Sequence, residues 1–405
     1  MSDDVVKSLA QSATQMLPQE ELVRVKKKKS SLFIGIPKET SLQEKRVPLV
    51  PDDVEFLVNN GHQVLIESKA GEKANFNDHA YSEAGAQIAY DHESVFKADI
   101  ILKVEPLSYE EIDLMQKGQT LISALQLSVQ PKNFLKKLIE KKITAIAYDY
   151  IQDSPGSLPV IRAMSEIAGN TSILIAAEYL SNVNGGKGMM MGGISGVKPT
   201  EVVIFGAGAV AEFAARAALG LGAMVRVFSN NTSKLRRLQE GIGQRIFTST
   251  LQPKVIKEAL KTANVAIGAL RSPTGQSPVI VSEEMIQKMQ EGSVIVDVSI
   301  DQGGCFETSK VTTHAKPTYE IYGVTHYCVP NIASRVARTA SYALSNIFAP
   351  VIIEMGNGGG VDDCVRKTHS IRSGIYLYKG MLTNQYLAER FSLPFKDLNL
   401  LLAAI

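Results

Sequence analysis

A short glycine-containing stretch carries the clearest chemical signal in the sequence. An apolar run at residues 202–205 is followed by Gly206-Ala207-Gly208, and apolar residues then recur at helical spacing. A G-x-G-x-x-A pattern between a strand and a helix is typical of a loop that binds the diphosphate of a dinucleotide. The first glycine permits a tight turn, the second leaves room for phosphate, and Ala211 lets the helix pack closely on the strand. Because the first amides of a helix have no partner within it, they would hold the diphosphate. The residues assigned to this site are Gly206, Gly208, Ala209 and Val210.

The end of the next predicted strand, residues 223–228, indicates how the adenosine half would be bound. A dinucleotide fold usually has an acidic residue there that binds the ribose hydroxyls. This chain has Ser229 and Asn230 instead, with Lys234 shortly after. No carboxylate would repel a 2′-phosphate, so one interpretation is NADP or a relaxed choice of cofactor. The other interpretation is a solvated helix start whose basic residues bind nothing.

Length and composition limit the class of protein. A chain of 405 residues with 45% hydrophobic residues is long enough for two domains, or three, with large cores. A net charge of +2 gives no field that would recruit nucleic acid or a membrane. Three cysteines without CxxC spacing favour a reducing compartment and no metal site. With no apolar run of transmembrane length and no signal-peptide core, we expect a cytoplasmic protein.

Strand-like and helix-like patterns alternate along most of the chain. This alternation predicts an α/β fold of two Rossmann-like domains, each a mainly parallel sheet flanked by helices, with a cleft between them. After Asn331 the pattern is helical to the end, so the tail would pack back on the first domain. We expect an extension at 1–31, a substrate domain at 32–159 plus 338–405, and a dinucleotide domain at 160–337. The predicted strands are 32–36, 62–67, 99–104, 120–125, 144–148, 202–205, 223–228, 265–270 and 293–299.

Several longer motifs resemble the alanine dehydrogenases and, more distantly, the alpha subunit of proton-translocating transhydrogenase. The resemblance extends over residues 32–400, and its most specific part runs from the DQGG segment to the YCVPN segment. The motifs are GIPKE (35–39), EKRV (44–47), ILKVEP (101–106), MSEIAG (164–169), GGISGV (192–197), VVIFGAG (202–208), GSVIVDVSIDQGGCFETS (292–309), THYCVPNI (325–332) and YKGMLTN (378–384).

The resemblance implies reversible oxidative deamination of an L-amino acid, typically alanine to pyruvate and ammonia, with NAD as cofactor and NADP as the alternative. Arg46 matches the family's carboxylate-binding arginine, and its planar fork suits a carboxylate. Asp301 matches the aspartate that meets nicotinamide and substrate at a strand end. Asn331 and Ser165 match residues that contact the cofactor, and the loop that begins at Leu270 would line it.

Two departures from the family pattern affect the chemistry. The family has a catalytic histidine in an L-H-L motif, where this chain has Gln126, which cannot exchange protons near neutral pH. The family motif L-K-V-K-E-P is one residue shorter here, so Lys103 matches either its first lysine or the substrate-binding second one. Because a shift of one residue turns a strand side chain to the opposite face, the two alignments differ in function. We assign Lys103 as the substrate-polarising group and Gln126 as the residue that orients substrate or water.

Two classes of function follow. The first is an NAD(P)-dependent amino-acid dehydrogenase that binds an amino acid or 2-oxo acid and neither nucleic acid nor membrane. The second is an impaired family member with a nucleotide-binding or regulatory role, or a transhydrogenase-like subunit. A homo-oligomer, dimer or hexamer, is expected from the resemblance alone.

Overall fold

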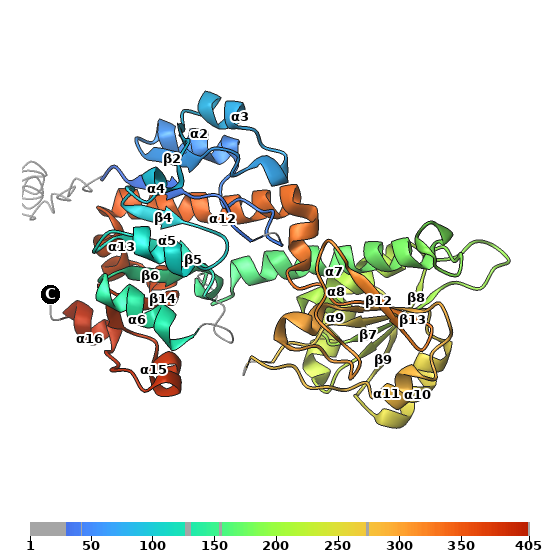
Figure 1. Cartoon of the computed structure of the whole chain (residues 1–405). Helices are drawn as coiled ribbons and strands as arrows, with labels where there is room; N and C mark the ends of the chain where they lie inside the picture. The colour runs from blue at the N-terminus through green and yellow to red at the C-terminus, as the bar shows by residue number, and fades with distance from the viewer. Residues whose placement is uncertain (1–29, 42, 126–130, 154–155, 273–274, 404–405) are drawn as a thin grey trace, which may run out of the picture.

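The computed structural model describes residues 30–41, 43–125, 131–153, 156–272 and 275–403. This part of the chain forms one eight-stranded and one seven-stranded sheet, each covered by helices (Figure 1). We call the part built on the eight-stranded sheet the first domain and the part built on the seven-stranded sheet the second domain. The predicted fold class, two mainly parallel sheets flanked by helices, is confirmed.

The first sheet is built from short apolar runs, and β4, β5 and β6 are buried along their whole length. Such strands are expected where helices cover both faces of a parallel sheet. The strand order is β15-β14-β6-β5-β4-β1-β2-β3, and β1 to β6 run parallel. The strands are β1 (Phe33–Ile36), β2 (Gln63–Glu67), β3 (Gln87–Ala89), β4 (Ile100–Leu102), β5 (Thr120–Ser123), β6 (Thr144–Ala147), β14 (Ile375–Tyr378) and β15 (Met381–Leu382).

The C-terminal segment corrects one sequence prediction. Residues after Asn331 are expected to be helical throughout, but β14 and β15 lie among them and join the first sheet. β14 is Ile-Tyr-Leu-Tyr, fully buried and antiparallel to β6. A run of four apolar residues is too short for periodicity to separate helix from strand, and its aromatic and β-branched residues favour a strand. The helices of this domain are α2 (Pro51–Asn59), α3 (Asp78–Glu83), α4 (His92–Val95), α5 (Tyr109–Leu114), α6 (Lys132–Glu140), α12 (Ala337–Gly358), α13 (Val361–Lys367), α14 (His369–Arg372), α15 (Gln385–Phe391) and α16 (Leu398–Ala403).

The second sheet has the order β12-β13-β11-β10-β7-β8-β9. All neighbours are parallel except β12 and β13, which form an antiparallel pair at one edge. The carboxyl ends of β7, β10 and β11 therefore lie side by side, which is where ligands bind in such sheets. The strands are β7 (Glu201–Phe205), β8 (Met224–Phe228), β9 (Phe247–Ser249), β10 (Val265–Gly268), β11 (Val294–Asp297), β12 (Thr318–Ile321) and β13 (Val324–Tyr327). The helices are α7 (Pro159–Leu180), α8 (Ala209–Gly220), α9 (Thr232–Ile242), α10 (Pro253–Thr262) and α11 (Glu283–Ile286).

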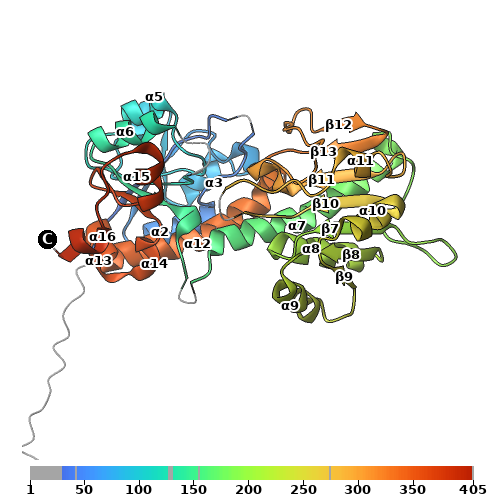
Figure 2. The same ribbon diagram turned by 90° about the horizontal axis from the view of Figure 1, so that it is seen from below.

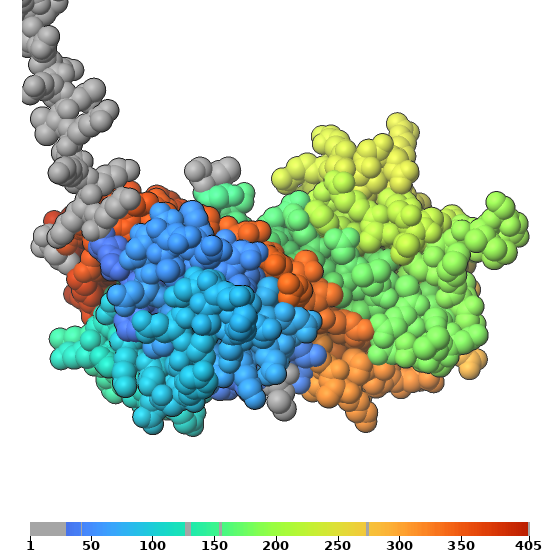
Figure 3. Space-filling view, turned by 90° about the horizontal axis from the view of Figure 1, so that it is seen from above, coloured from blue at the N-terminus to red at the C-terminus, as the bar shows by residue number. Residues whose placement is uncertain are grey.

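Two long helices, α7 and α12, run side by side where the domains meet (Figures 1 and 2). α7 packs closely on α8, and a Cβ at Gly169 would lie 2.5 Å from the carbonyl oxygen of Val210. On the face shown in Figure 3, the orange segment to which α12 belongs lies between the blue part of the first domain and the green part of the second. Among the described residues, Ile332–Gly358 is long and apolar enough to cross a membrane by length and composition alone. It contacts α2, α7 and α13, as a core helix does.

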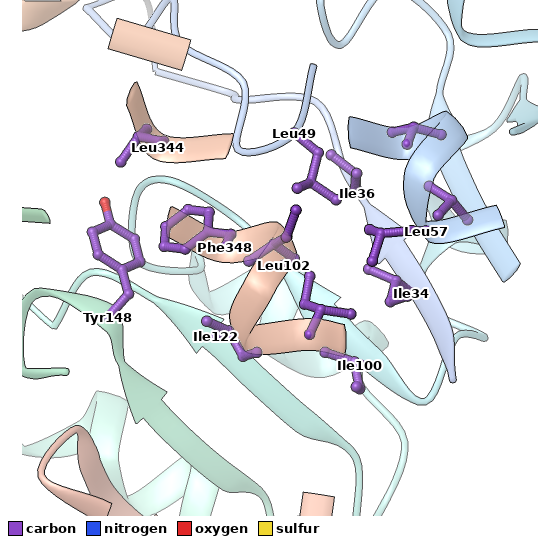
Figure 4. Close-up of a cluster of buried hydrophobic side chains, with 14 of the residues drawn as sticks. Ile34, Ile36, Leu49, Leu57, Ile100, Leu102, Ile122, Tyr148, Leu344 and Phe348 are labelled. Carbon is purple, nitrogen blue, oxygen red and sulfur yellow. The ribbon is translucent and has the colours of Figure 1, made fainter. Parts of the chain in front are cut away.

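The core of the first domain fixes the end of β6 against α12. Tyr148, the residue after β6, packs on Phe348 of α12 with 5.1 Å between ring centroids. Its hydroxyl donates to the carbonyl of Val104 at 2.6 Å. Figure 4 shows this cluster, with Ile34, Ile36, Leu49, Leu57, Ile100, Leu102, Ile122 and Leu344 around the two rings. The backbone at residues 148–149 is therefore held rigidly at the carboxyl edge of the sheet.

Candidate active site

The glycine loop lies between β7 and α8, so the strand, turn and helix that give the motif its meaning are present. Gly206 has a φ of 128°, and a Cβ there would lie 2.2 Å from the carbonyl oxygen of Ala269. A Cβ at Gly208 would meet no atom within 4 Å. The helix that starts at Ala209 has no side-chain cap, so the amides at its start are available. Open space beside uncapped amides fits the diphosphate of a dinucleotide.

The residues after β8 form a compact turn beside this loop. Ser229 is buried, and its hydroxyl accepts from the amide of Asn231 at 3.2 Å. Asn230 accepts from the amide of Leu251 at 3.0 Å, which ties the turn to the segment after β9. Lys234 is exposed on α9. The turn has Ser229 where a dinucleotide fold usually has an acidic residue. It is compatible both with NADP or a relaxed choice of cofactor and with a helix start whose basic residues bind nothing.

Arg46 lies almost fully buried in the first domain, at 8% exposure, and is held by its neighbour Glu44. Its Nε and Nη2 donate to the two oxygens of Glu44 at 2.8 and 2.6 Å. Nη1 lies 3.2 Å from the sulfur of Met164 on α7. One hydrogen of Nη1 and one of Nη2 are engaged by neither Glu44 nor Met164, and two such parallel donors match a carboxylate.

Glu44 is the fixed anion of this pair. Burial alone would raise its pKa, but the charge and hydrogen bonds of Arg46 and a bond from Asn331 lower the pKa overall. Asn331 Nδ2 donates to Glu44 at 2.6 Å, and Asn331 belongs to the second domain. Glu44 therefore stays ionised, orients the Arg46 fork and links the two domains.

Asp301 follows β11 and faces the first domain. Its Oδ1 accepts from the amide of Asn331 at 2.9 Å. Desolvation by the surrounding protein raises the pKa of Asp301, although the residue is exposed to solvent. The hydrogen bond from the Asn331 amide and the charges of Arg46 and Arg271 act in the opposite direction and lower the pKa. Asn331 thus contacts both Glu44 and Asp301, and the structure brings together three of the predicted residues, Arg46, Asp301 and Asn331.

A buried carboxylate that sequence reasoning missed holds the Asp301 loop. Asp297 accepts from the amides of Ser299 and Cys305 at 3.0 and 2.9 Å and from the hydroxyl of Ser309 at 2.7 Å. The hydroxyl of Ser299 accepts from the amide of Leu270 at 2.9 Å, which fixes the start of the predicted cofactor loop. An acidic residue that ends an apolar run was the available signal, since the chain reads VIVD before the DQGG segment.

Lys103 lies directly after β4 and is 1% exposed. Its Nζ lies 3.3 Å from Glu39 and 3.1 Å from Glu111 on α5, and 3.4 Å from the carbonyl of Pro106. These contacts hold the ammonium in a buried ionic cluster, which we call the Lys103 cluster. The assignment of Lys103 as the substrate-polarising group stays a prediction. To polarise a substrate, the ammonium would have to give up its contacts with Glu39 and Glu111.

The Lys103 cluster is expected to make stability depend on pH. Burial raises the pKa of Glu39 to about 8, against the charge of Lys103. A carboxyl with a raised folded pKa binds a proton in the folded state that the unfolded chain has lost, so its contribution to stability falls as pH rises from 4.5 to about 8. Glu39→Gln, which keeps the acceptor for the Val104 amide, should flatten that part of the stability curve in urea unfolding. An unchanged slope would show that Glu39 does not titrate there.

Two further predicted residues complete the survey. Gln126 lies outside the described residues. Ser165 lies on α7, next to Met164, which contacts Arg46. The residues just before Gln126 are described, and the amide of Leu125 donates to Asp149 at 3.4 Å. Asp149 follows Tyr148 at the end of β6, and nothing in its sequence context marked it.

Comparison with known proteins shows the family to which the chain belongs. The family model described as alanine dehydrogenase/PNT, N-terminal domain, matches residues 35–168, and the C-terminal domain model matches residues 172–385. The chain belongs to the alanine dehydrogenase family. An alanine dehydrogenase of Methanococcus maripaludis is 42% identical over 90% of this chain and 98% of its own length. Alanine dehydrogenase 2 of Staphylococcus aureus strain USA300 is 39% identical over the same shares.

Solved structures support the same assignment. An L-alanine dehydrogenase superposes with a TM-score of 0.83 and 37% identity, covering 89% of this chain and 99% of that one. A transhydrogenase from Sinorhizobium meliloti superposes with a TM-score of 0.74 at 22% identity, covering 87% and 99%, and shares the fold. The predicted family is therefore confirmed.

Proposed function

We propose that this protein is an NAD-dependent alanine dehydrogenase, which converts L-alanine and water to pyruvate and ammonia and catalyses the reverse reaction. The observation that carries the proposal is the chain of contacts Arg46–Glu44–Asn331–Asp301, which sets a carboxylate-binding fork of one domain against a carboxylate of the other. The names of relatives that match nearly their whole length support the choice of alanine.

The residues present can perform the parts of this reaction. A nicotinamide cofactor, when bound, would supply the acceptor and donor of the hydride. The loop Gly206 to Val210 would hold its diphosphate through amides at the start of α8. Arg46 would hold the substrate carboxylate, and Asn331 would fix Arg46 through Glu44. Asp301, whose pKa is raised by its surroundings, would take up the proton that the substrate amine loses as the imine forms.

Turnover of purified protein tests the proposal. With pyruvate, ammonium and NADH we expect oxidation of NADH and formation of L-alanine, and with L-alanine and NAD the reverse. Calorimetric titration with NADH on the same sample separates binding from turnover. Binding without turnover would favour the alternative, an impaired member with a regulatory role, for which Gln126 and the paired Lys103 are the motivating observations.

The choice between NAD and NADP depends on the turn after β8. Ser229→Asp would place a carboxylate where the ribose hydroxyls are bound, repelling a 2′-phosphate. We expect the affinity for NADPH to fall at least about tenfold relative to NADH, a change of about 1.4 kcal/mol. Calorimetric titration with each cofactor measures the ratio. An unchanged ratio would show that this turn does not contact the ribose.

We also propose a cytoplasmic homo-oligomer. The resemblance supports the oligomer, and the three free, buried cysteines, Cys305, Cys328 and Cys364, fit a reducing compartment. Light scattering of the purified protein measures the oligomeric state.

A further inference from the structure

We propose that Asp149 is the group that transfers protons during hydrolysis of the imine in this site: it takes a proton from the water that attacks the substrate imine and returns it to the departing nitrogen. The inference rests on the proposed function. It answers a question that the sequence raises, since the position at which the family has a histidine is Gln126.

The backbone places Asp149 at the carboxyl edge of the first sheet, where β5 and β6 end. β5 and β6 pair in parallel, with Ser123 opposite Ala147, so the segments that follow these two strands leave the sheet as neighbours. The 3.4 Å hydrogen bond from the Leu125 amide to Asp149 Oδ1 joins them directly. The carboxylate of Asp149 therefore contacts the backbone of Leu125, the residue that precedes Gln126 in the sequence.

The other residues around Asp149 connect it to the site already described. Tyr148, its neighbour, is buried next to the charge of Arg46. On the other side, Arg271 of the second domain acts electrostatically on both Asp149 and Asp301. Arg271 is therefore close enough to a carboxylate of each domain to act on both, which links Asp149 to the Asp301 side of the site.

The surroundings of Asp149 suit a group that gains and loses a proton near neutral pH. Burial raises its pKa from 3.8 to about 6, against the backbone amides of Asp149 and Leu125 and the charge of Arg271. The titratable groups that face it are Tyr148, Tyr150, Tyr376 and Arg271. The hydroxyl of Tyr376 is buried without a hydrogen-bond partner among the described residues, so it can support a water or the protonated carboxyl.

His314 is the histidine that competes for this role. It lies near Asn331 and Glu44, and its Nε2 is buried without a hydrogen-bond partner in the described part of the chain. Burial, Lys45 and Arg335 lower its pKa, so its protonated form is disfavoured. We place the role on Asp149 because its surroundings move its pKa towards neutrality, to about 6, whereas those of His314 move the pKa of the imidazole away from it.

The proton step balances without another reactant. The carboxylate accepts one proton from water as the new carbon–oxygen bond forms on the protonated imine, which gives a carbinolamine. The protonated Asp149 returns that proton to the nitrogen as the carbon–nitrogen bond breaks. The hydroxyl proton passes to the released ammonia, leaving pyruvate, ammonium and an ionised Asp149. Reductive amination runs through the same steps in reverse.

The test compares Asp149→Asn with Asp149→Glu, using the whole protein. The asparagine variant is expected to lower kcat about 10²- to 10⁴-fold and to remove the limb of the pH–rate profile near pH 6. The glutamate variant should recover part of the rate and keep a limb. Asp113→Asn, which changes an exposed carboxylate paired with Lys137, is the matched control.

A measurement independent of turnover completes the test. In ¹³C-carboxyl NMR of aspartate-labelled protein, one resonance should titrate near pH 6 and be absent from Asp149→Asn. Thermal unfolding and NADH titration show whether the variant is folded and binds cofactor. A folded Asp149→Asn that keeps its rate and pH profile, or His314→Gln that alone removes the limb, would overturn the inference while leaving the proposed function. An inactive wild-type protein would overturn both.

Discussion

Lys103→Met is expected to lower the free energy of unfolding by about 3–5 kcal/mol. The substitution leaves the carboxyls of Glu39 and Glu111 buried without the Lys103 ammonium. Glu39 can take up a proton, but the ion-pair partner that Glu111 keeps in the described part of the chain is His92, 3.7 Å away. Removing one member of a buried ionic group leaves the remaining charge with its full desolvation penalty. Urea unfolding of the wild-type and variant proteins at neutral pH measures the loss.

Two further variants separate charge from shape. Lys137→Met removes an exposed partner of Asp113 and should change stability by no more than about 1 kcal/mol. Adding Glu111→Gln to Lys103→Met should restore much of the lost stability, since Glu39 can take up a proton. A Lys103→Met protein as stable as the wild type but without turnover would instead support the substrate-polarising role assigned from the sequence.

Arg46→Lys is expected to lower kcat/KM for pyruvate roughly 30- to 4000-fold. This corresponds to a loss of about 2–5 kcal/mol in the stabilisation of the transition state. A lysine keeps a charge beside Glu44, so the fold is retained, but it cannot offer two parallel donors to a carboxylate. The loss should appear mainly in KM if Arg46 binds substrate and transition state equally. Steady-state kinetics with pyruvate and ammonium give both constants.

The control for Arg46 is another arginine paired with a glutamate. Arg162→Lys changes an exposed pair with Glu166 on α7 and should leave both constants near the wild-type values. NADH affinity should be unchanged in both variants, because Arg46 belongs to the first domain and the glycine loop to the second. If Arg46→Lys kept full activity, the carboxylate would have to bind elsewhere.

Local sequence patterns predicted the elements that have a long periodic run of apolar residues or a glycine-rich turn. The strand, glycine turn and helix from Glu201 to Gly220 were visible because Gly206 must adopt a φ open to few other residues. β14 could not be predicted in this way, because four apolar residues inside a helical pattern are too few to show the periodicity of a strand.

The site divides in the same way. Arg46, Asp301 and Asn331 could be proposed from motifs that surround them, whereas the Lys103 cluster depends on Glu39, which is far from Lys103 in sequence, and on the path of the chain that brings Glu111 back to it. Asp149 gave no signal, because its environment is created by Leu125 from the neighbouring strand and Arg271 from the other domain. Long-range pairing of this kind is set by the sheet register.

The chain crosses between the domains twice, once through α7 and once where Asn331 leads into α12. Asn331 has a φ of 56°, a left-handed turn, and the chain reverses direction there. The same residue bonds to Glu44 and Asp301. The hydrogen bond between Asn331 and Glu44 thus joins the two domains beside the point where the chain passes back to the first. Separation of the domains would lengthen this bond, so the orientation of Arg46 by Glu44 is tied to the distance between the domains.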